Sequence, residues 1–407
     1  LPISRNGEMQ VLRFKEVSLK KIFALTLVLL VGISLLGLAD GQIAIVLDVG
    51  GRGDLSFNDM GFAGADRAAT EFDLEVTEVQ SASAADYLPN FRNLARTGDY
   101  ELILGIGFLL GDALGTVAAE YPDQKFAIID VGWIQAPNIM NYVFRENEMS
   151  ALIGALAGMA AADAGFAATG IVLGIPIPVL YHFEAGYRFG QDWGLAKYAE
   201  LTGNAAEVAL LYTYTGTFDD IALGKAASEA MLAQGAVGIY NVAGPLGTGD
   251  HEAVVEFHDN AGTIYGAPFY FGVDANQDWF GQGFHALASG MKRVDQAAYS
   301  AVEAVMTDTF VAGVTSLGLA EGGVGISDLD LLIEFIEFGV GAGAVEDTQS
   351  ARNYIVANWT ANRATVASWI WDAVADLEAG ILDGSIVVPT ADNDEEIEAV
   401  RADYPLN

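Results

Sequence analysis

Carboxylate and aromatic side chains follow several apolar, strand-like runs, where they could bind a small polar molecule with a flat part. Asp48 follows IAIVL, Asp130 follows FAII, and Asp274 follows YFGV. One carboxylate can accept two charge-assisted hydrogen bonds from a vicinal diol. Phe57 lies in the polar stretch SFND, where it could either stack on a planar ligand or pack beneath a following helix. Each acid taken alone could equally be a surface residue, so their common placement at strand ends favours a ligand site.

The glycine-rich stretch DVGGRGDLSFN, residues 48–58, is expected to form a loop between a buried strand and a helix. Backbone amides and a helix N-terminus converge on a ligand at such a place. No Gly-Lys-Ser/Thr follows, and the glycines do not fit G-x-G-x-x-G, so neither a P-loop nor a dinucleotide fingerprint is present. Ionised carboxylates in a narrow cleft disfavour a phosphate, which favours an uncharged ligand over a nucleotide.

Other reactive side chains give no catalytic pattern. The histidines lack metal-ligand spacing, although His182 could contact a ligand because it precedes Phe183. Glu146 and Glu148 could be paired catalytic acids, but acids at a helix start are more often dipole or capping partners. The sequence contains no cysteine and shows no Ser-His-Asp arrangement. We therefore predict no catalytic residue, no metal site and no cofactor.

Charge and the N-terminal residues indicate where the protein works. With 19 basic and 54 acidic residues the formal net charge is −35, which excludes a nucleic-acid partner. This acidity suits either saline surroundings or a strongly solubilising surface. Lys20 and Lys21 precede an apolar run over 22–38, so residues 1–41 are predicted to be a signal peptide or an uncleaved N-terminal anchor. The rest is expected at the cell surface or in the periplasm.

From residue 42 onward, short apolar runs alternate with helical stretches, which predicts βαβ units and mainly parallel sheets. The pattern restarts near residue 146. We expect an α/β protein with two lobes, each a mainly parallel sheet flanked by helices, in the manner of a type I periplasmic binding protein. The N-terminal lobe would comprise 42–145 and about 289–320, and the C-terminal lobe 146–288 and about 321–388. Ligands of such folds bind outside the carboxyl ends of the strands.

The last part of the chain is less regular. Residues 328–365 lack a clean period and are predicted to form a helical insertion, and GSIVVP is predicted to be a last strand. Residues 389–407 are predicted to be an acidic, solvated tail.

Several blocks, in order, resemble the basic membrane protein family of ABC-transporter substrate-binding lipoproteins. They are DVGGRGDLSFN, GIGF, FAIID, FRENEMSALIGALAG, HFEAGYRFG, YTGTFDD, NVAGPLGTG, FGVDANQD and LASGMKRVD. The resemblance covers residues 42–302 and resumes weakly in GGVGISD and GSIVVP. The best-known members bind purine nucleosides, so the resemblance implies a nucleoside receptor that delivers its ligand to an ABC permease in the membrane.

The resemblance also implies roles for individual residues. Asp48 and Asp130 would accept hydrogen bonds from the base edge, and Phe57 and Phe183 would enclose its two faces. Asp274 would accept from the ribose hydroxyls. The other implied lining residues are Lys292, Asn58, Gly107 and Gly244.

The sequence departs from the family pattern at its N-terminal region. Family members are usually anchored through a lipidated cysteine after the signal core, and this sequence has no cysteine. Free secretion, retention by an uncleaved helix and an archaeal style of attachment stay open. Two alternative functions also stay open: a sugar-binding or sensory receptor of the same fold, and an extracellular nucleoside hydrolase, which would need a metal-binding acidic cluster.

Overall fold

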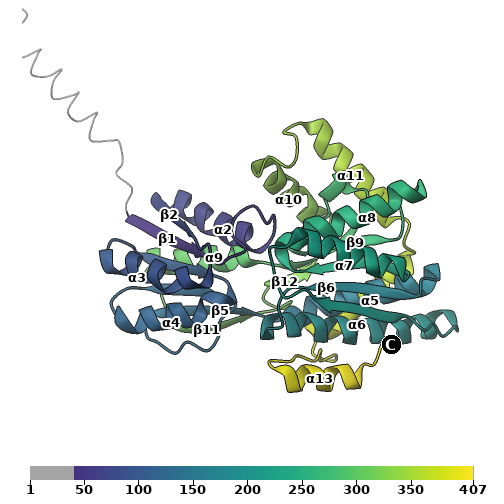
Figure 1. Cartoon of the computed structure of the whole chain (residues 1–407), viewed down its shortest axis with the longest axis horizontal. Helices are drawn as coiled ribbons and strands as arrows, with labels where there is room; N and C mark the ends of the chain where they lie inside the picture. Colours follow the sequence, from purple (N-terminus) through teal and green to yellow (C-terminus); the bar gives the residue numbers. More distant parts are fainter. Residues whose placement is uncertain (1–40, 407) are drawn as a thin grey trace, which may run out of the picture. The chain divides into compact units, whose positions relative to one another are not determined.

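Two six-stranded sheets form the frame of the protein (Figure 1). The structure is a computed structural model and describes residues 41–406. The predicted signal peptide or anchor at 1–41 therefore lies almost wholly outside the described residues.

The first sheet has the strand order β11-β5-β4-β3-β1-β2, and all its strands run parallel. Its strands are β1 (Gly41–Leu47), β2 (Leu74–Gln80), β3 (Leu102–Ile106), β4 (Phe126–Ile129), β5 (Ile139–Phe144) and β11 (Gly313–Leu317). Helices α2 (Phe57–Glu71) and α9 (Val294–Met306) cover one face, and α3 (Tyr87–Thr97) and α4 (Gly111–Glu120) cover the other. We call this sheet and its helices the N-terminal lobe.

Side chains along β1 point alternately to the two faces of this sheet, and both sets are apolar and covered by helices. Ile43 and Ile45 pack with α2 and α9, whereas Ala44 and Val46 pack with α3 and α4. A parallel strand that is buried on both faces is apolar at every position, which is what the run IAIVL shows.

The second sheet has the order β12-β10-β9-β8-β6-β7, with only the short edge strand β12 antiparallel to its neighbour. Its strands are β6 (Ala168–Leu173), β7 (Ala209–Tyr214), β8 (Ala236–Val242), β9 (Phe269–Asp274), β10 (Ala286–Lys292) and β12 (Val324–Ile326). Its helices are α5 (Glu146–Ala164), α6 (Pro178–Thr202), α7 (Ile221–Ala233) and α8 (Gly247–Ala261). Together they form the C-terminal lobe, and the predicted two-lobed α/β architecture is confirmed.

Helices α5 and α6 pack at close range because glycines face backbone across their interface. A Cβ on Gly154 would lie 2.3 Å from the carbonyl oxygen of Tyr187, and one on Gly190 would lie 2.0 Å from that of Ala151. These glycines set the position of α6 and therefore of the residues near its start.

The chain passes between the two sheets three times, after β5, after β10 and after β11. Strand β10 extends to Lys292 within the second sheet, so the second crossing lies a few residues beyond the expected boundary near residue 289. Backbone hydrogen bonds join the first two crossings to the third. In the first crossing the N–H of Arg145 donates to the carbonyl of Leu317, and in the second the N–H of Arg293 donates to the carbonyl of Gly323.

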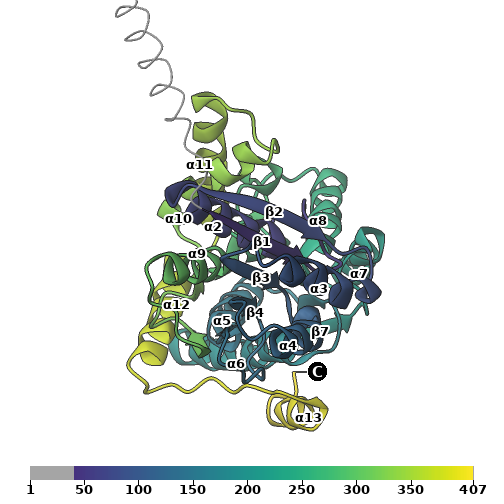
Figure 2. The same cartoon turned by 90° about the vertical axis from the view of Figure 1, so that its left-hand side faces the viewer.

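After β12 the chain forms four helices: α10 (Leu329–Gly341), α11 (Gln349–Arg363), α12 (Ser368–Leu382) and α13 (Asp394–Asp403). Helices α10 and α11 occupy the predicted helical insertion at 328–365 (Figure 1). The strand predicted in GSIVVP is wrong, because residues 384–392 form no strand and run as a connection between α12 and α13 (Figure 2).

The prediction of a solvated tail at 389–407 is wrong for α13. Ile397 and Val400 are buried against Tyr181 and Ala185 of α6. The guanidinium of Arg401 donates to both carboxylate oxygens of Glu184, at 2.8 and 2.7 Å. The dense acidic residues of this segment lie on the exposed face of an amphipathic helix and obscure its short apolar face. We call residues 384–406 the C-terminal arm.

Candidate ligand-binding site

A cavity lies where the carboxyl ends of the strands of both sheets meet. It encloses about 630 Å³ of space that protein atoms do not occupy, part of which is continuous with solvent. Its walls include all nine predicted site residues: Asp48, Phe57, Asn58, Gly107, Asp130, Phe183, Gly244, Asp274 and Lys292. Residues that are far apart in sequence are thus brought together by the two sheets.

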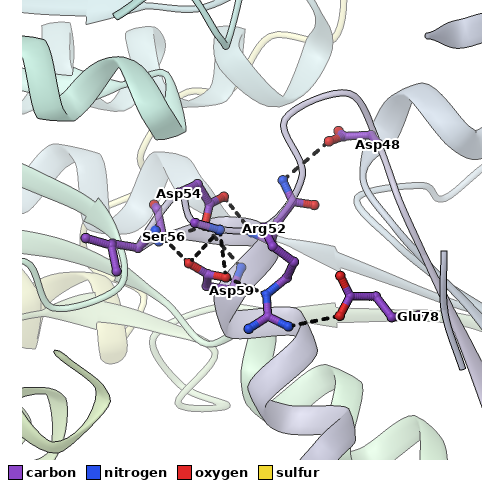
Figure 3. Close-up of polar contacts among 9 residues, drawn as sticks. Asp48, Arg52, Asp54, Ser56, Asp59 and Glu78 are labelled. Carbon is purple, nitrogen blue, oxygen red and sulfur yellow. Dashed lines mark hydrogen bonds and ion pairs between the residues drawn. The ribbon is translucent and has the colours of Figure 1, made fainter. Parts of the chain in front are cut away.

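Asp48, directly after β1, is held by its own loop (Figure 3). The backbone N–H of Gly50 donates to Oδ1 of Asp48 at 2.9 Å. Nδ2 of Asn58 donates to the same oxygen at 3.3 Å. Burial raises the pKa of Asp48 to about 6, against the lowering effect of these two bonds. The other oxygen, Oδ2, has no protein partner among these contacts, so Asp48 can accept a ligand hydrogen bond.

Asp54 fixes the start of α2. Its carboxylate accepts hydrogen bonds from the backbone N–H groups of Ser56, Asn58 and Asp59, at 3.0, 2.8 and 3.1 Å. Ser56 occupies the N-cap position but makes no side-chain cap bond, so the acid two residues earlier performs the capping. Burial and the neighbouring Asp59 raise the pKa of Asp54 to about 7.

Asp59 restrains the same loop from inside the helix. Its carboxylate accepts from the backbone N–H groups of Gly53 and Leu55 and from Nε of Arg52, whose guanidinium also reaches Glu78 (Figure 3). The two acids therefore hold the loop and the first turn of α2 in one conformation. Phe57 and Asn58, which line the cavity, are positioned by this network.

Asp130 directly follows β4 and Asp274 is the last residue of β9, the corresponding strands of the two lobes. Both have a left-handed backbone, with φ of 67° and 62°, a conformation that Asp adopts more readily than most residues. Burial raises the pKa of Asp130 to about 6 and that of Asp274 to about 7, although Lys292 acts in the opposite direction on both. Strained residues of this kind concentrate at functional sites.

Lys292 ends β10 and is 1% exposed. Its ammonium lies 2.7 Å from Oδ2 of Asp130 in the other lobe and 3.0 Å from Oε1 of Glu146 at the start of α5. Burial alone would lower its pKa, but the surrounding carboxylates raise it above its usual value. Oδ1 of Asp130 is buried without a protein partner, so this carboxylate retains one acceptor while the lysine occupies the other.

The rings of Phe57 and Phe183 line the cavity from α2 and α6, one from each lobe. Phe183 is 2% exposed and its ring centroid lies 6.4 Å from that of Tyr240. The ammonium of Lys292 lies 5.2 Å from the Phe57 centroid and 5.9 Å from the Phe183 centroid. Each ring therefore belongs to the wall of the cavity and also contacts its charged cluster.

Gly107 follows β3 and Gly244 lies just after β8, each at the start of a short 3₁₀ helix: Gly107 precedes Phe108–Leu110, and Gly244 is the first residue of Gly244–Leu246. Both have positive φ, 123° and 53°. A Cβ on Gly107 would lie 2.5 Å from Oδ2 of Asp48, whereas one on Gly244 would meet nothing within 4 Å. The first glycine leaves room for the Asp48 carboxylate, and the second leaves its side of the cavity open.

The sequence predictions missed part of the site. Asp54, Phe108 and Phe218 line the cavity, together with the apolar residues Ile177, Val179, Leu180, Val242 and Val273. Asp54 and Phe108 belong to the motifs DVGGRGDLSFN and GIGF, which also contain the predicted site residues Asp48 and Gly107. Their position in these motifs is the sequence signal that could have identified them. The spacing of apolar residues along the sequence does not distinguish those that line the cavity from those that lie in the core.

Glu146 is also misjudged by the sequence, which favours a capping role. The helix α5 that it begins shows no side-chain cap bond, and Glu146 instead pairs with Lys292 and with Nδ1 of His182, at 2.9 Å. His182 does not line the cavity described above. It lines a second, neighbouring cavity, together with Glu146 and Asp392.

Within residues 41–406, no three His, Asp or Glu side chains are grouped so that they could hold a metal ion. Over the same residues, no helix combines the length and apolar character needed to cross a membrane.

Comparisons with known proteins agree with this arrangement. Residues 42–336 match the Bmp family model, described as ABC transporter substrate-binding protein PnrA-like. An uncharacterized lipoprotein of Pyrococcus abyssi is 38% identical over 362 residues, which cover 88% of this chain and 86% of that one. The ABC transporter nucleoside-binding protein BmpA of Lactococcus lactis is 29% identical and covers 86% of this chain and 90% of its own.

A solved structure supports the fold as well. The ABC transporter solute-binding protein of Aeropyrum pernix superposes with a TM-score of 0.82 at 35% identity, over 90% of this chain and 97% of its own. The fold is thus that of a type I periplasmic binding protein. The helices α11, α12 and α13 lie beyond the region that the family model matches. The chain belongs to the Bmp family of ABC transporter substrate-binding proteins.

Proposed function

We propose that the cavity binds a nucleoside, preferably a purine nucleoside, and that the protein delivers it to an ABC permease. The observation that carries this proposal is that one cavity is lined by acceptors from both lobes, Asp48, Asp130 and Asp274, and by the rings of Phe57 and Phe183. A purine nucleoside presents flat faces for the rings, base-edge donors and a vicinal diol. The name of the Lactococcus lactis relative is consistent with this ligand.

The charges of the cavity support an uncharged ligand. Lys292 is the only basic residue among those that line it, and its ammonium is already paired with Asp130 and Glu146. A ligand phosphate would meet four aspartates without a free cation. We therefore propose that nucleosides bind and nucleotides do not.

The location is proposed on the same basis. Family members are substrate-binding proteins of ABC transporters, and the Pyrococcus relatives are named lipoproteins. We propose that residues 41–406 act on the outer side of the cytoplasmic membrane, held there by residues 1–41 or released.

A thermal-shift screen tests the ligand. Guanosine, adenosine, the matching nucleoside monophosphates, free bases and ribose are each added to the purified protein. A ligand at 100 times its dissociation constant adds about 2.7 kcal/mol to the free energy of unfolding. We expect shifts with purine nucleosides and none with the monophosphates.

Two outcomes would overturn the proposal in different ways. A shift with ribose alone would identify a sugar receptor of the same fold. If chromatography shows that free base is released from guanosine during the incubation, the protein is a nucleoside hydrolase.

A further inference from the structure

A line of ionic contacts connects the ligand cavity to the C-terminal arm. Lys292 contacts Asp130 at 2.7 Å and Glu146 at 3.0 Å. The second oxygen of Glu146 contacts Nδ1 of His182 at 2.9 Å, and Nε2 of His182 contacts Oδ1 of Asp392 at 2.9 Å. Of these five residues, Asp130 and Lys292 lie in the wall of the ligand cavity, and the other three do not.

The contacts join segments that lie far apart in the sequence and that belong to both lobes and to the C-terminal arm. Asp130 belongs to the N-terminal lobe, while Lys292, Glu146 and His182 belong to β10, α5 and α6 of the C-terminal lobe. Asp392 belongs to the arm, beyond the residues that the family model matches. The arm is held in place nearby, because Nδ2 of Asn147 donates to the carbonyls of Val388 and Pro389, at 3.0 and 3.2 Å.

The charges along this line alternate in sign. Burial would raise the pKa of Glu146, but Lys292 and His182 lower it below its usual value. Burial would lower the pKa of His182, but Glu146 and Asp392 raise it to about 9. The imidazole is thus a cation at neutral pH, and it takes up one oxygen of Glu146 while the other meets Lys292.

We propose that His182 and Asp392 are positioning residues for the ligand site, and that the C-terminal arm thereby sets the affinity of the site. Protonated His182, held by Asp392, fixes the carboxylate of Glu146. Fixed Glu146 holds the ammonium of Lys292 beside Asp130, which leaves Oδ1 of Asp130 free to accept from the ligand. The inference rests on the proposed function only in the choice of ligand.

Asp392 offers the cleanest test because its side chain is 69% exposed and its replacement leaves the core intact. We expect D392N to weaken guanosine binding, measured by titration calorimetry, about fivefold or more, as is typical for coupling between separate sites. D392E should keep most of the affinity. D403N is the control, since Asp403 is an exposed acid on the same arm that contacts neither His182 nor the cavity.

A double-mutant cycle separates positioning from general support of the fold. If Asp392 acts through His182, D392N in an H182Q background should change the affinity less than twofold. Wild-type affinity for adenosine, which unlike guanosine has no ionisable group in this pH range, should also fall above about pH 9, where His182 loses its proton, and the H182Q variant should lack this step. The charged groups that act on His182 are Glu146, Asp392 and Asp130. The second cavity, which His182 lines, is also lined by Asp112, Arg145 and Glu148.

Wild-type affinity in D392N, or full additivity of D392N and H182Q, would overturn the inference. If the screen shows that ribose binds and guanosine does not, the nucleoside proposal fails by itself. The same variants are then titrated with ribose, because Asp130 lines the cavity for either ligand.

Discussion

The hydroxyl of Ser56 in the N-terminal lobe donates to the carbonyl of Val273 at 2.9 Å and lies 3.3 Å from Oδ2 of Asp274 in the C-terminal lobe. Nearby, Nε2 of Gln277 donates to the carbonyl of Leu55 at 3.2 Å. The loop that holds Asp48 and Phe57 is therefore attached to the strand end that carries Asp274. The two walls of the cavity are joined by hydrogen bonds as well as by the crossing segments.

Replacing Ser56 with alanine should weaken ligand binding, because the Ser56 hydroxyl attaches the loop that carries Phe57 to the strand end that carries Asp274. A neutral hydrogen bond contributes about 1 kcal/mol, so S56A should bind guanosine about fivefold less tightly by calorimetry. S350A, a change at an exposed serine of α11, should leave the affinity unchanged. Equal affinity of S56A and wild type would show that the Ser56 bonds do not contribute to the bound state.

Replacing Phe57 with alanine should remove one stacking surface. Stacking of a base on an aromatic ring contributes about 1–3 kcal/mol, so F57A should weaken purine nucleoside binding by roughly 5- to 150-fold. F257A removes a ring of the same kind from α8, where it is 39% exposed and outside the cavity, and serves as the control. Full affinity in F57A would assign the ring to packing alone.

Asp54 should matter for both stability and affinity. Loss of a helix cap costs about 1–2 kcal/mol, so D54A should unfold at lower urea concentration and also bind guanosine less tightly. D328A is a matched control, because Asp328 caps α10 through the backbone N–H of Leu331 at 2.8 Å and neither it nor its neighbours line the cavity. We expect D328A to lose stability without losing affinity. If the two variants behave alike in affinity, Asp54 does not position the cavity residues.

The strand-end acids show what the sequence could predict. Each follows an apolar run whose length identifies a buried parallel strand, and parallel strands place their carboxyl ends at one edge. Asp48, Asp130 and Asp274 could therefore be placed in one site. The alternation of apolar runs with helical stretches likewise predicted two mainly parallel sheets flanked by helices, which the structure has.

What the sequence could not predict depends on contacts between distant segments. Glu146 looks like any acid at a helix start until Lys292 and His182 are brought beside it. The apolar face of α13 is only two buried residues wide, Ile397 and Val400, and is hidden among acids. Such features arise from tertiary packing and leave no period in the sequence.

Buried histidines should make stability sensitive to acid. Burial lowers the pKa of His285 to about 4, with a further contribution from His258, whose ring is stacked on it at 4.3 Å. An unfolded histidine titrates near 6.5. The stabilisation from neutral His285 is therefore complete above pH 6.5 and is lost as the pH falls toward 4.

The H285Q variant tests whether His285 makes the protein less stable as the pH falls. Between pH 4 and 6.5 its free energy of unfolding should rise with pH less steeply than that of wild type, by up to about 1.4 kcal/mol per pH unit. Urea denaturation at several pH values measures the difference. Comparison with wild type is needed because Asp54 and Asp274, whose pKa values burial raises to about 7, act with the opposite sign. Identical slopes would mean that His285 is not held neutral.

The net charge of −35 should make stability depend on salt. Self-repulsion opposes the compact state, and salt screens it. The melting temperature should therefore rise by several degrees between about 0.1 and 1 M KCl, where the screening length falls from roughly 10 to 3 Å. Sucrose at equal osmolality is the control, since it does not screen charge. A rise of equal size in sucrose would attribute the effect to solvent exclusion.

The end of the C-terminal arm has a consequence for solubility. Strand β7 is an edge of the second sheet, and its Leu210 donates a backbone hydrogen bond to the carbonyl of Leu406 at 3.0 Å. An uncovered edge strand offers unpaired amides to strands of other molecules and promotes aggregation. The arm accepts a hydrogen bond from one of these amides and places the charged helix α13 beside the edge strand. By covering its own sheet margin in this way, the protein discourages copies of itself from joining strand to strand at high concentration.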